Sequence, residues 1–157
     1  DKITYKEYSK NYFYMDTYIN IKINSTKNKQ EIDNIFNDID YLYSSYNKLT
    51  NRYEKYDGIV NIYYLNEILS NNEEIEIDKK LSDIINIGIE YYDKTNGLFN
   101  IASGNLTGIW KEYINKCNSL PSNKELDVNI NINDIKLDNN KHFFNISLSC
   151  FKLKNLN

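Results

Sequence analysis

The chain has 157 residues, of which 41% are hydrophobic and 14% aromatic, and its formal net charge at pH 7 is -3. A chain of this length can bury roughly 70% of the surface that its unfolded form exposes, which excludes a disordered protein. Its 19 basic residues are scattered among 22 acidic ones, and no apolar run approaches the ~18 residues of a membrane span. We therefore predict one folded domain that binds no nucleic acid.

Asparagine is very common in this sequence, with 27 residues, whereas alanine and arginine occur once each, as Ala102 and Arg52. Isoleucine, lysine and tyrosine are also abundant, and this bias is typical of AT-rich codons. A single Asn or Tyr is therefore weak evidence for a functional site.

The first third of the chain predicts a strand and a long helix. Residues 1–11 are polar and are interpreted as an N-terminal tail. Apolar and polar residues then alternate over 12–23, with the period of a half-buried strand. Asn28 and Glu31 have the spacing of a capping box, and the apolar residues over 32–46 follow helical spacing. We expect one strand followed by an amphipathic helix.

The middle of the chain predicts a loop and a second helix. Residues 50–61 lose the helical period and contain the turn signal Asp57-Gly58. A helical turn over 62–69 and a short extended piece over 75–77 are expected next. Asp78 is placed to cap a helix that Gly97 ends, because glycine readily takes the left-handed conformation of a helix stop.

The last third predicts a short helix and two strands. A connector over 98–105 precedes a helix over 106–117, and the box Ser122-x-x-Glu125 indicates another helical start. Alternation over 128–137 and 142–148 predicts two strands joined by a turn.

This order predicts an α+β fold in which amphipathic helices pack on a mixed or antiparallel sheet. Only residues 149–157 follow the last predicted strand, so we expect the sheet to stop at an unprotected edge and the domain to be incomplete.

Motifs that would identify a catalytic centre by themselves are missing. The sequence has no Gly-rich phosphate loop, no nucleophile elbow and no metal-spaced His pair, and His142 is its only histidine. Cys117 and Cys150 are far apart and allow at most one disulfide. Composition and spacing alone reach only a folded α+β domain.

The order of several short segments is more informative. Between Tyr12 and Leu148 the chain contains, in sequence, Met15-Asp16-Thr17, Arg52-Tyr53, Tyr56-Asp57-Gly58, Asn66, Thr95-Asn-Gly97-Leu-Phe99-Asn100, Trp110 and Leu120-Pro121. In this order they resemble the N-terminal half of the ApbE-type FAD:protein FMN transferases, formerly called thiamine-biosynthesis lipoproteins. The T-x-G-x-F segment, with the Trp that follows it, is the strongest part of the resemblance.

The resemblance implies a bacterial enzyme that cleaves FAD with Mg²⁺ and transfers FMN to a Thr or Ser hydroxyl of an acceptor protein, of the redox-pump subunit type. It also implies export and a lipid anchor at the cell membrane. By matching position, it places six residues along the flavin nucleotide: Met15, Tyr53, Tyr56, Leu98, Phe99 and Asn100. Tyr53 matches by its Arg-Tyr context and Tyr56 by its distance to Asn66, so both are kept.

Plainer interpretations of these residues stay open. Met15 could be strand core, and Phe99 could pack on the helix before it. Asn100 stands where the family usually has Asp, which keeps an acceptor oxygen but loses the charge.

The end of the chain departs from the family. Residues 145–154 stand where the family has an Asp-Leu-Gly-Gly segment, and Mg²⁺ ligands are largely absent. We therefore interpret 12–148 as the N-terminal part of an FMN-transferase-like domain and 149–157 as an aberrant or truncated end. The expected function is a transferase that is inactive as this chain alone. The alternatives are a non-catalytic half-domain that binds a flavin or a protein, with a dimer through its open sheet edge, and a structural domain without a ligand.

Overall fold

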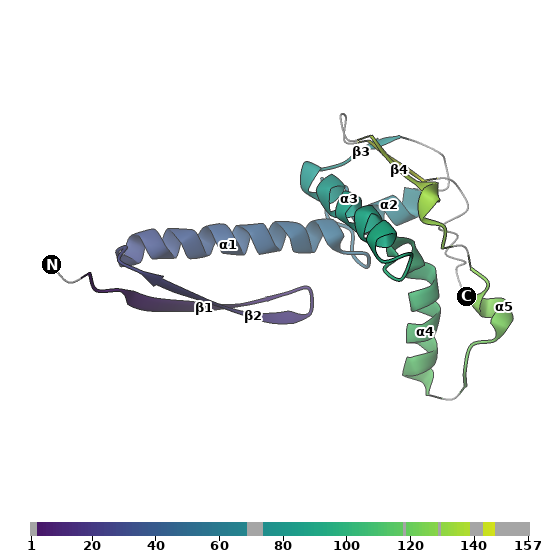
Figure 1. The fold of residues 1–157 in the computed structure, drawn as a ribbon, viewed down its shortest axis with the longest axis horizontal. Helices are drawn as coiled ribbons and strands as arrows, with labels where there is room; N and C mark the ends of the chain where they lie inside the picture. The colour runs from purple at the N-terminus through teal and green to yellow at the C-terminus, as the bar shows by residue number, and fades with distance from the viewer. Residues whose placement is uncertain (1–2, 69–73, 118, 129, 139–142, 147–157) are drawn as a thin grey trace.

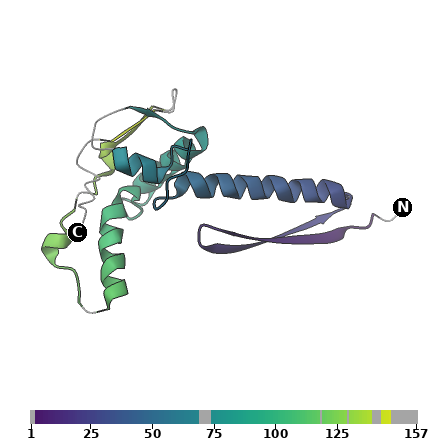
Figure 2. The ribbon, with the colours of Figure 1, turned by 180° about the vertical axis from the view of Figure 1, so that it is seen from behind.

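The computed structural model describes residues 3–68, 74–117, 119–128, 130–138 and 143–146. Figure 1 shows an elongated N-terminal part, in which a hairpin lies along helix α1, and a C-terminal part, in which shorter helices and a small sheet gather at the far end of α1; Figure 2 shows the same arrangement from behind. The elements are β1 Lys6–Tyr14, β2 Thr17–Ser25, α1 Lys29–Thr50, α2 Ile62–Ile68, β3 Ile75–Glu76, α3 Lys79–Lys94, the 3-10 turn η2 Ile101–Ser103, α4 Gly104–Lys116, α5 Asn123–Leu126, the 3-10 turn η3 Ile132–Asp134, β4 Ile135–Asp138 and β5 Phe143–Ile146.

The predicted α+β class is confirmed, with helices and antiparallel sheets in one chain. The strands form two separate sheets, the hairpin β1–β2 and a three-stranded sheet in the order β3–β5–β4. Each strand pair in the described part of the chain is antiparallel.

The N-terminal hairpin corrects the prediction of one strand over 12–23. β1 begins at Lys6, inside the segment 1–11 that was interpreted as a tail, and the chain reverses at Met15 and Asp16. The outward side chains of β1 are mostly polar, which hid the strand, while its inward tyrosines face α1 opposite the isoleucines of β2. The turn itself contains neither Gly nor Asn, the usual signals of a two-residue hairpin loop.

Helix α1 begins as predicted. The side chain of Asn28 accepts a hydrogen bond from the Glu31 N–H at 3.0 Å, and the Glu31 carboxylate accepts one from the Asn28 N–H at 3.1 Å. One face of the helix buries Ile32 and Phe36 against Tyr12, whose hydroxyl donates to the Phe36 carbonyl at 2.8 Å. These three residues form the N-terminal core cluster.

A second core cluster lies at the far end of α1. Its buried residues are Leu49 of α1, Leu65 of α2, and Ile77, Leu81 and Ile85 around α3. The predicted cap of α3 is confirmed, because the Asp78 carboxylate accepts from the Lys80 N–H at 2.7 Å. The helix then ends in left-handed backbone at Asn96 (φ 51°) and Gly97 (φ 83°).

Gly88 lets α3 approach the turn after it. A Cβ at this position would lie 2.6 Å from Cγ2 of Ile101. We expect Gly88→Ala to destabilise the fold by about 1–3 kcal/mol, since this overpacking outweighs the helix propensity that alanine gains. Gly108→Ala is the control: its Cβ would meet nothing closer than 3.8 Å. It should stabilise α4 by up to about 1 kcal/mol. Urea unfolding followed by circular dichroism measures both, and equal effects of the two variants would contradict the steric account.

The α4–α5 connection uses a second predicted capping box, which is confirmed. Ser122 caps α5, and its hydroxyl and backbone N–H both donate to the Glu125 carboxylate. Tyr113 of α4 donates to the same carboxylate at 2.5 Å. These bonds, the Ser122 hydroxyl first, lower the pKa of Glu125 to about 2. The Glu125 carboxylate, which accepts the hydrogen bonds of the α4–α5 connection, therefore stays charged at neutral pH.

The C-terminal strands differ from the prediction in two ways. The strand expected over 128–137 covers only Ile135–Asp138, because η3 occupies the residues before it. The last strand was expected at an open edge, but β5 is central, between β3 and β4. The sequence missed this because the extended piece that became β3 is only two residues long and far away in the chain. Residues 149–157 lie outside the described part.

No helix in the described ranges combines the length and the apolar character that crossing a membrane requires.

Candidate functional site

Met15 occupies the turn of the hairpin rather than the strand core. Its backbone is left-handed (φ 53°), as is that of Asp16 (φ 53°), although neither is glycine. Left-handed backbone costs a side-chain-bearing residue about 1–2 kcal/mol. The turn is held to α1 by a hydrogen bond from the Met15 N–H to Oδ1 of Asn47 at 3.0 Å, and the Thr17 hydroxyl donates to the Met15 carbonyl. Met15 is thus an exposed side chain on a strained, anchored turn.

Tyr53 lies in the loop that follows α1, in a turn built by Asn51. Oδ1 of Asn51 accepts from the N–H groups of Tyr53 (2.7 Å) and Glu54 (3.0 Å). The Arg52 guanidinium lies 5.3 Å from the centroid of the Tyr53 ring, and Nζ of Lys111 lies 5.1 Å from it. Two cations from different elements therefore meet at one exposed ring.

Unlike Tyr53, Tyr56 has a hydroxyl that makes hydrogen bonds to other residues of its own loop. Its hydroxyl donates to the Glu54 carboxylate at 2.8 Å and accepts from the Asn51 side chain at 3.1 Å. The bond to Glu54 is the main cause of the raised pKa of Tyr56. Of the two tyrosines kept by the sequence analysis, Tyr53 is the one that is largely exposed.

Leu98 and Phe99 follow α3 and are exposed. The Phe99 ring packs edge-on against Tyr91 of α3, with centroids 6.1 Å apart, and its N–H donates to the Thr95 hydroxyl. Phe99 does touch the preceding helix, as the plainer interpretation expected, and about half of its surface stays exposed. Exposed fractions are 47% for Met15, 63% for Tyr53, 92% for Leu98 and 49% for Phe99.

Asn100 is occupied at both ends of its amide. Oδ1 accepts from the Ala102 N–H at 2.8 Å and so caps η2, while Nδ2 donates to the Ile130 carbonyl at 2.8 Å. The Asn100 carbonyl accepts from the hydroxyl and the N–H of Ser103, so side chain and carbonyl together shape the loop after α3.

Three loops carry these residues, and they lie toward the same end of α1. Asn47, which anchors the Met15 turn, is four residues from Asn51, and Arg52 reaches the Gly104 carbonyl across the α3–α4 loop at 3.5 Å. Figure 1 shows the hairpin turn below this part of α1, and α4 running downward from the C-terminal part beyond the end of α1. Within the described residues no hydrogen bond or ring contact joins Met15, Tyr53 and Phe99 to one another.

Asn61 is a positioning residue that the sequence analysis missed. Its fully buried side chain donates to the carbonyls of Lys48 (3.2 Å) and Glu54 (2.8 Å) and accepts from the Tyr64 N–H (2.9 Å). It therefore ties the end of α1, the Tyr53 loop and the start of α2 together. The signal was an Asn directly before the apolar run 62–65, but it was hidden among the many other asparagines.

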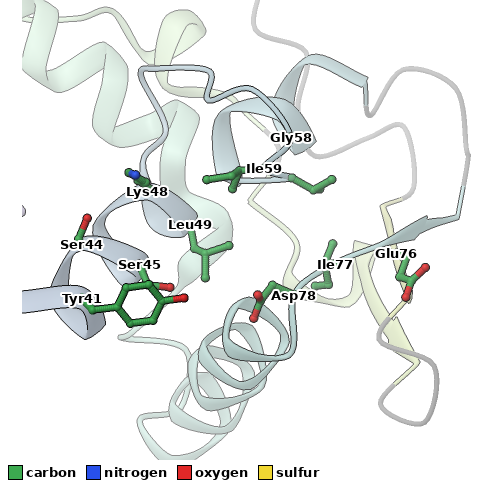
Figure 3. A pocket seen from close by; sticks show the side chains of 11 residues that line it. Tyr41, Ser44, Ser45, Lys48, Leu49, Gly58, Ile59, Glu76, Ile77 and Asp78 are labelled. Atoms are coloured by element: carbon green, nitrogen blue, oxygen red, sulfur yellow. The ribbon is translucent and has the colours of Figure 1, made fainter. Parts of the chain in front are cut away.

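An open pocket of about 570 Å³ lies elsewhere, between the C-terminal half of α1, the Gly58 turn and the start of α3 (Figure 3). Its lining includes Ser44, Lys48 and Glu76 but none of the six predicted site residues. The Asp78 carboxylate at its rim already caps α3. The pocket and the predicted residues are thus separate places on the molecule.

The described residues contain no group of three or more His, Cys, Asp or Glu side chains that could hold a metal ion. Mg²⁺ is usually bound through one or two carboxylates together with waters and the phosphates of a substrate.

Comparison with known proteins identifies the class. The family model described as the ApbE family matches residues 15–155, and the chain belongs to this family. Among solved structures, the chain is similar to the crystal structure of the ApbE protein from Thermotoga maritima, with a TM-score of 0.73 and 18% identity. This match covers 90% of the chain but 45% of that protein, so the chain spans less than half of its length. No curated protein matches the chain.

Proposed function

We propose that the chain is the flavin-nucleotide-binding part of an FAD:protein FMN transferase. The observation that carries the proposal is the strained turn that presents Met15. The backbone of this methionine is left-handed, the turn is held in place by Asn47, and the side chain is exposed rather than packed in the core. Backbone strain at an exposed residue is commonly found where a ligand is bound. Membership of the ApbE family supports a flavin as that ligand.

The chemistry of the exposed residues suits FAD as a substrate. The Met15 thioether is polarizable and the Phe99 ring is planar, so both can contact an aromatic ring system. Leu98 adds apolar surface, and the side chain of Asn100 holds the shape of the same loop. Tyr53 and its two cations would face the polar part of the nucleotide.

The proposed reaction is transfer of the FMN moiety. The hydroxyl oxygen of a Thr or Ser on an acceptor protein attacks the flavin-side phosphorus, and the bond from this phosphorus to the bridging oxygen breaks. AMP leaves with the bridging oxygen, and the hydroxyl proton is released to solvent. This chain would position the nucleotide, and we expect it to bind FAD without turning it over. The acceptor, of the redox-pump subunit type, the Mg²⁺ requirement of the whole enzyme and its export with a lipid anchor at the membrane are part of the same proposal and rest on the family resemblance.

Met15→Gly tests the proposal. We expect FAD affinity to fall about five- to tenfold, since the thioether contact is lost. The hairpin should become more stable by about 0.5–1 kcal/mol, because glycine relieves the left-handed strain. Titration with FAD followed by flavin fluorescence, and urea unfolding, measure the two effects.

Tyr5→Ala is the matched control, since Tyr5 is also exposed and precedes the opposite end of β1. It should leave FAD affinity unchanged. The proposal is wrong if the folded wild-type chain binds no FAD, or if the two variants lose the same affinity. Saturable binding with no AMP detected by mass spectrometry, even with Mg²⁺ and an acceptor present, is the result expected of this chain alone.

A further inference from the structure

Two cations of the described residues lie against one aromatic ring. Within the described residues, six lysines pair with carboxylates: Lys22, Lys27, Lys29, Lys79, Lys94 and Lys116. Arg52 and Lys111 pair with none of the described carboxylates and converge on the Tyr53 ring instead. What distinguishes this pair is that both cations come together at one exposed ring, although they belong to different elements.

Most of the donors of these two cations are unused. The only hydrogen bond of Arg52 among the described residues is the long one to the Gly104 carbonyl at 3.5 Å, although a guanidinium has five N–H donors. Nζ of Lys111 donates to the Tyr53 hydroxyl at 3.3 Å, which leaves two of its three donors. The cluster could therefore give several charge-assisted hydrogen bonds to one ligand.

Helix α4 provides the floor of this cluster. Gly104, Gly108 and Lys111 are spaced to lie on one face of the helix, and Arg52 lies over the two glycines, with Nη2 3.8 Å from where a Cβ of Gly108 would be. Ser103 makes no side-chain bond to the first N–H groups of α4. The partial positive charge of a helix start therefore adds to that of Arg52.

We infer that Arg52, Tyr53 and Lys111 form a site for the diphosphate of a nucleotide. The planar guanidinium can hold two phosphate oxygens at once, and the lysine acts as a point charge beside it. Two positive charges match a diphosphate better than a single carboxylate. This inference rests on the proposed function in that FAD would supply the diphosphate, but the site itself is defined by these residues alone.

Inorganic pyrophosphate is the probe. In a titration followed by ¹H–¹⁵N NMR, we expect the amide signals of Gly104 and Gly108 to shift saturably. Arg52→Gln and Lys111→Gln should each weaken binding about tenfold, as loss of a charge-assisted hydrogen bond does. Arg52→Lys should bind more tightly than Arg52→Gln but less tightly than the wild type, because lysine keeps the charge and loses the bidentate geometry of the guanidinium. Raising the salt concentration should lower the pyrophosphate affinity of the wild-type chain more than that of either Gln variant.

Lys116→Gln is the control on the same helix, because Lys116 is paired with Glu112. It should change pyrophosphate affinity less than twofold. The inference is overturned if the glycine signals do not respond, or if Lys116→Gln loses as much as the other variants. FAD bound equally well by wild type and Arg52→Gln would overturn the inference and leave the proposed function standing. If pyrophosphate shifts the glycine signals but FAD does not bind, the diphosphate site is supported and the proposed flavin-binding function is wrong.

Discussion

Replacing Leu81 with alanine is expected to destabilise the protein by about 2–5 kcal/mol. Leu81 is fully buried in the first turn of α3 and packs in the second core cluster with Leu65 and Ile85. Removing it leaves a cavity that its neighbours can fill only in part. Small domains are stable by about 5–15 kcal/mol, so this one change should remove a large share of the total. The midpoint of urea unfolding measures the loss.

Ile87→Ala is the control for this prediction. Ile87 lies on the same helix and is 53% exposed. Its loss should cost less than about 1 kcal/mol, since little apolar area returns to water. If both variants lose the same stability, α3 does not pack on the second core cluster as described.

Asn61→Ala should cost about 2–4 kcal/mol. The substitution removes a helix cap and three hydrogen bonds at a buried position, and it leaves the carbonyls of Lys48 and Glu54 without their donor. The loop that carries Tyr53 should lose its fixed shape at the same time. We expect FAD and pyrophosphate affinity to fall even under conditions where the variant remains folded by circular dichroism.

Asn37→Ala is the matched control, because Asn37 is exposed on α1. It should leave both stability and ligand affinity within error of the wild type. Equal stability of the two variants would show that the Asn61 side chain does not connect α1, the loop and α2.

Local signals in the sequence predicted local structure well. Two capping boxes, at Asn28 and Ser122, and the Asp78 cap were confirmed at the atoms expected. Each depends on residues only two or three positions apart, so the chain needs no distant partner to form it. The ApbE family was likewise predicted from the order of short segments and is confirmed.

Long-range pairing could not be predicted in the same way. β3 is two residues long and pairs with β5 about seventy residues later, a contact for which neither segment carries a local signal. The hairpin turn was missed because Met15 and Asp16 adopt a backbone that their residue types disfavour. At the site, the resemblance selected Tyr53 but could not show that Arg52 and Lys111 flank it, since Lys111 belongs to another helix.

The division of the core into two clusters has a mechanical consequence. The cluster of Tyr12, Ile32 and Phe36 shares no buried residue with that of Leu49, Leu65 and Leu81, and α1 joins them over the 13 residues from Phe36 to Leu49, about 20 Å at 1.5 Å per residue. Met15 is carried by the first unit, and Tyr53 and Phe99 by the second. Because the Met15 turn is anchored at Asn47, the last turn of α1 sets the span between the two halves of the proposed ligand contact. Bending the helix at this turn would separate them while each unit remained folded.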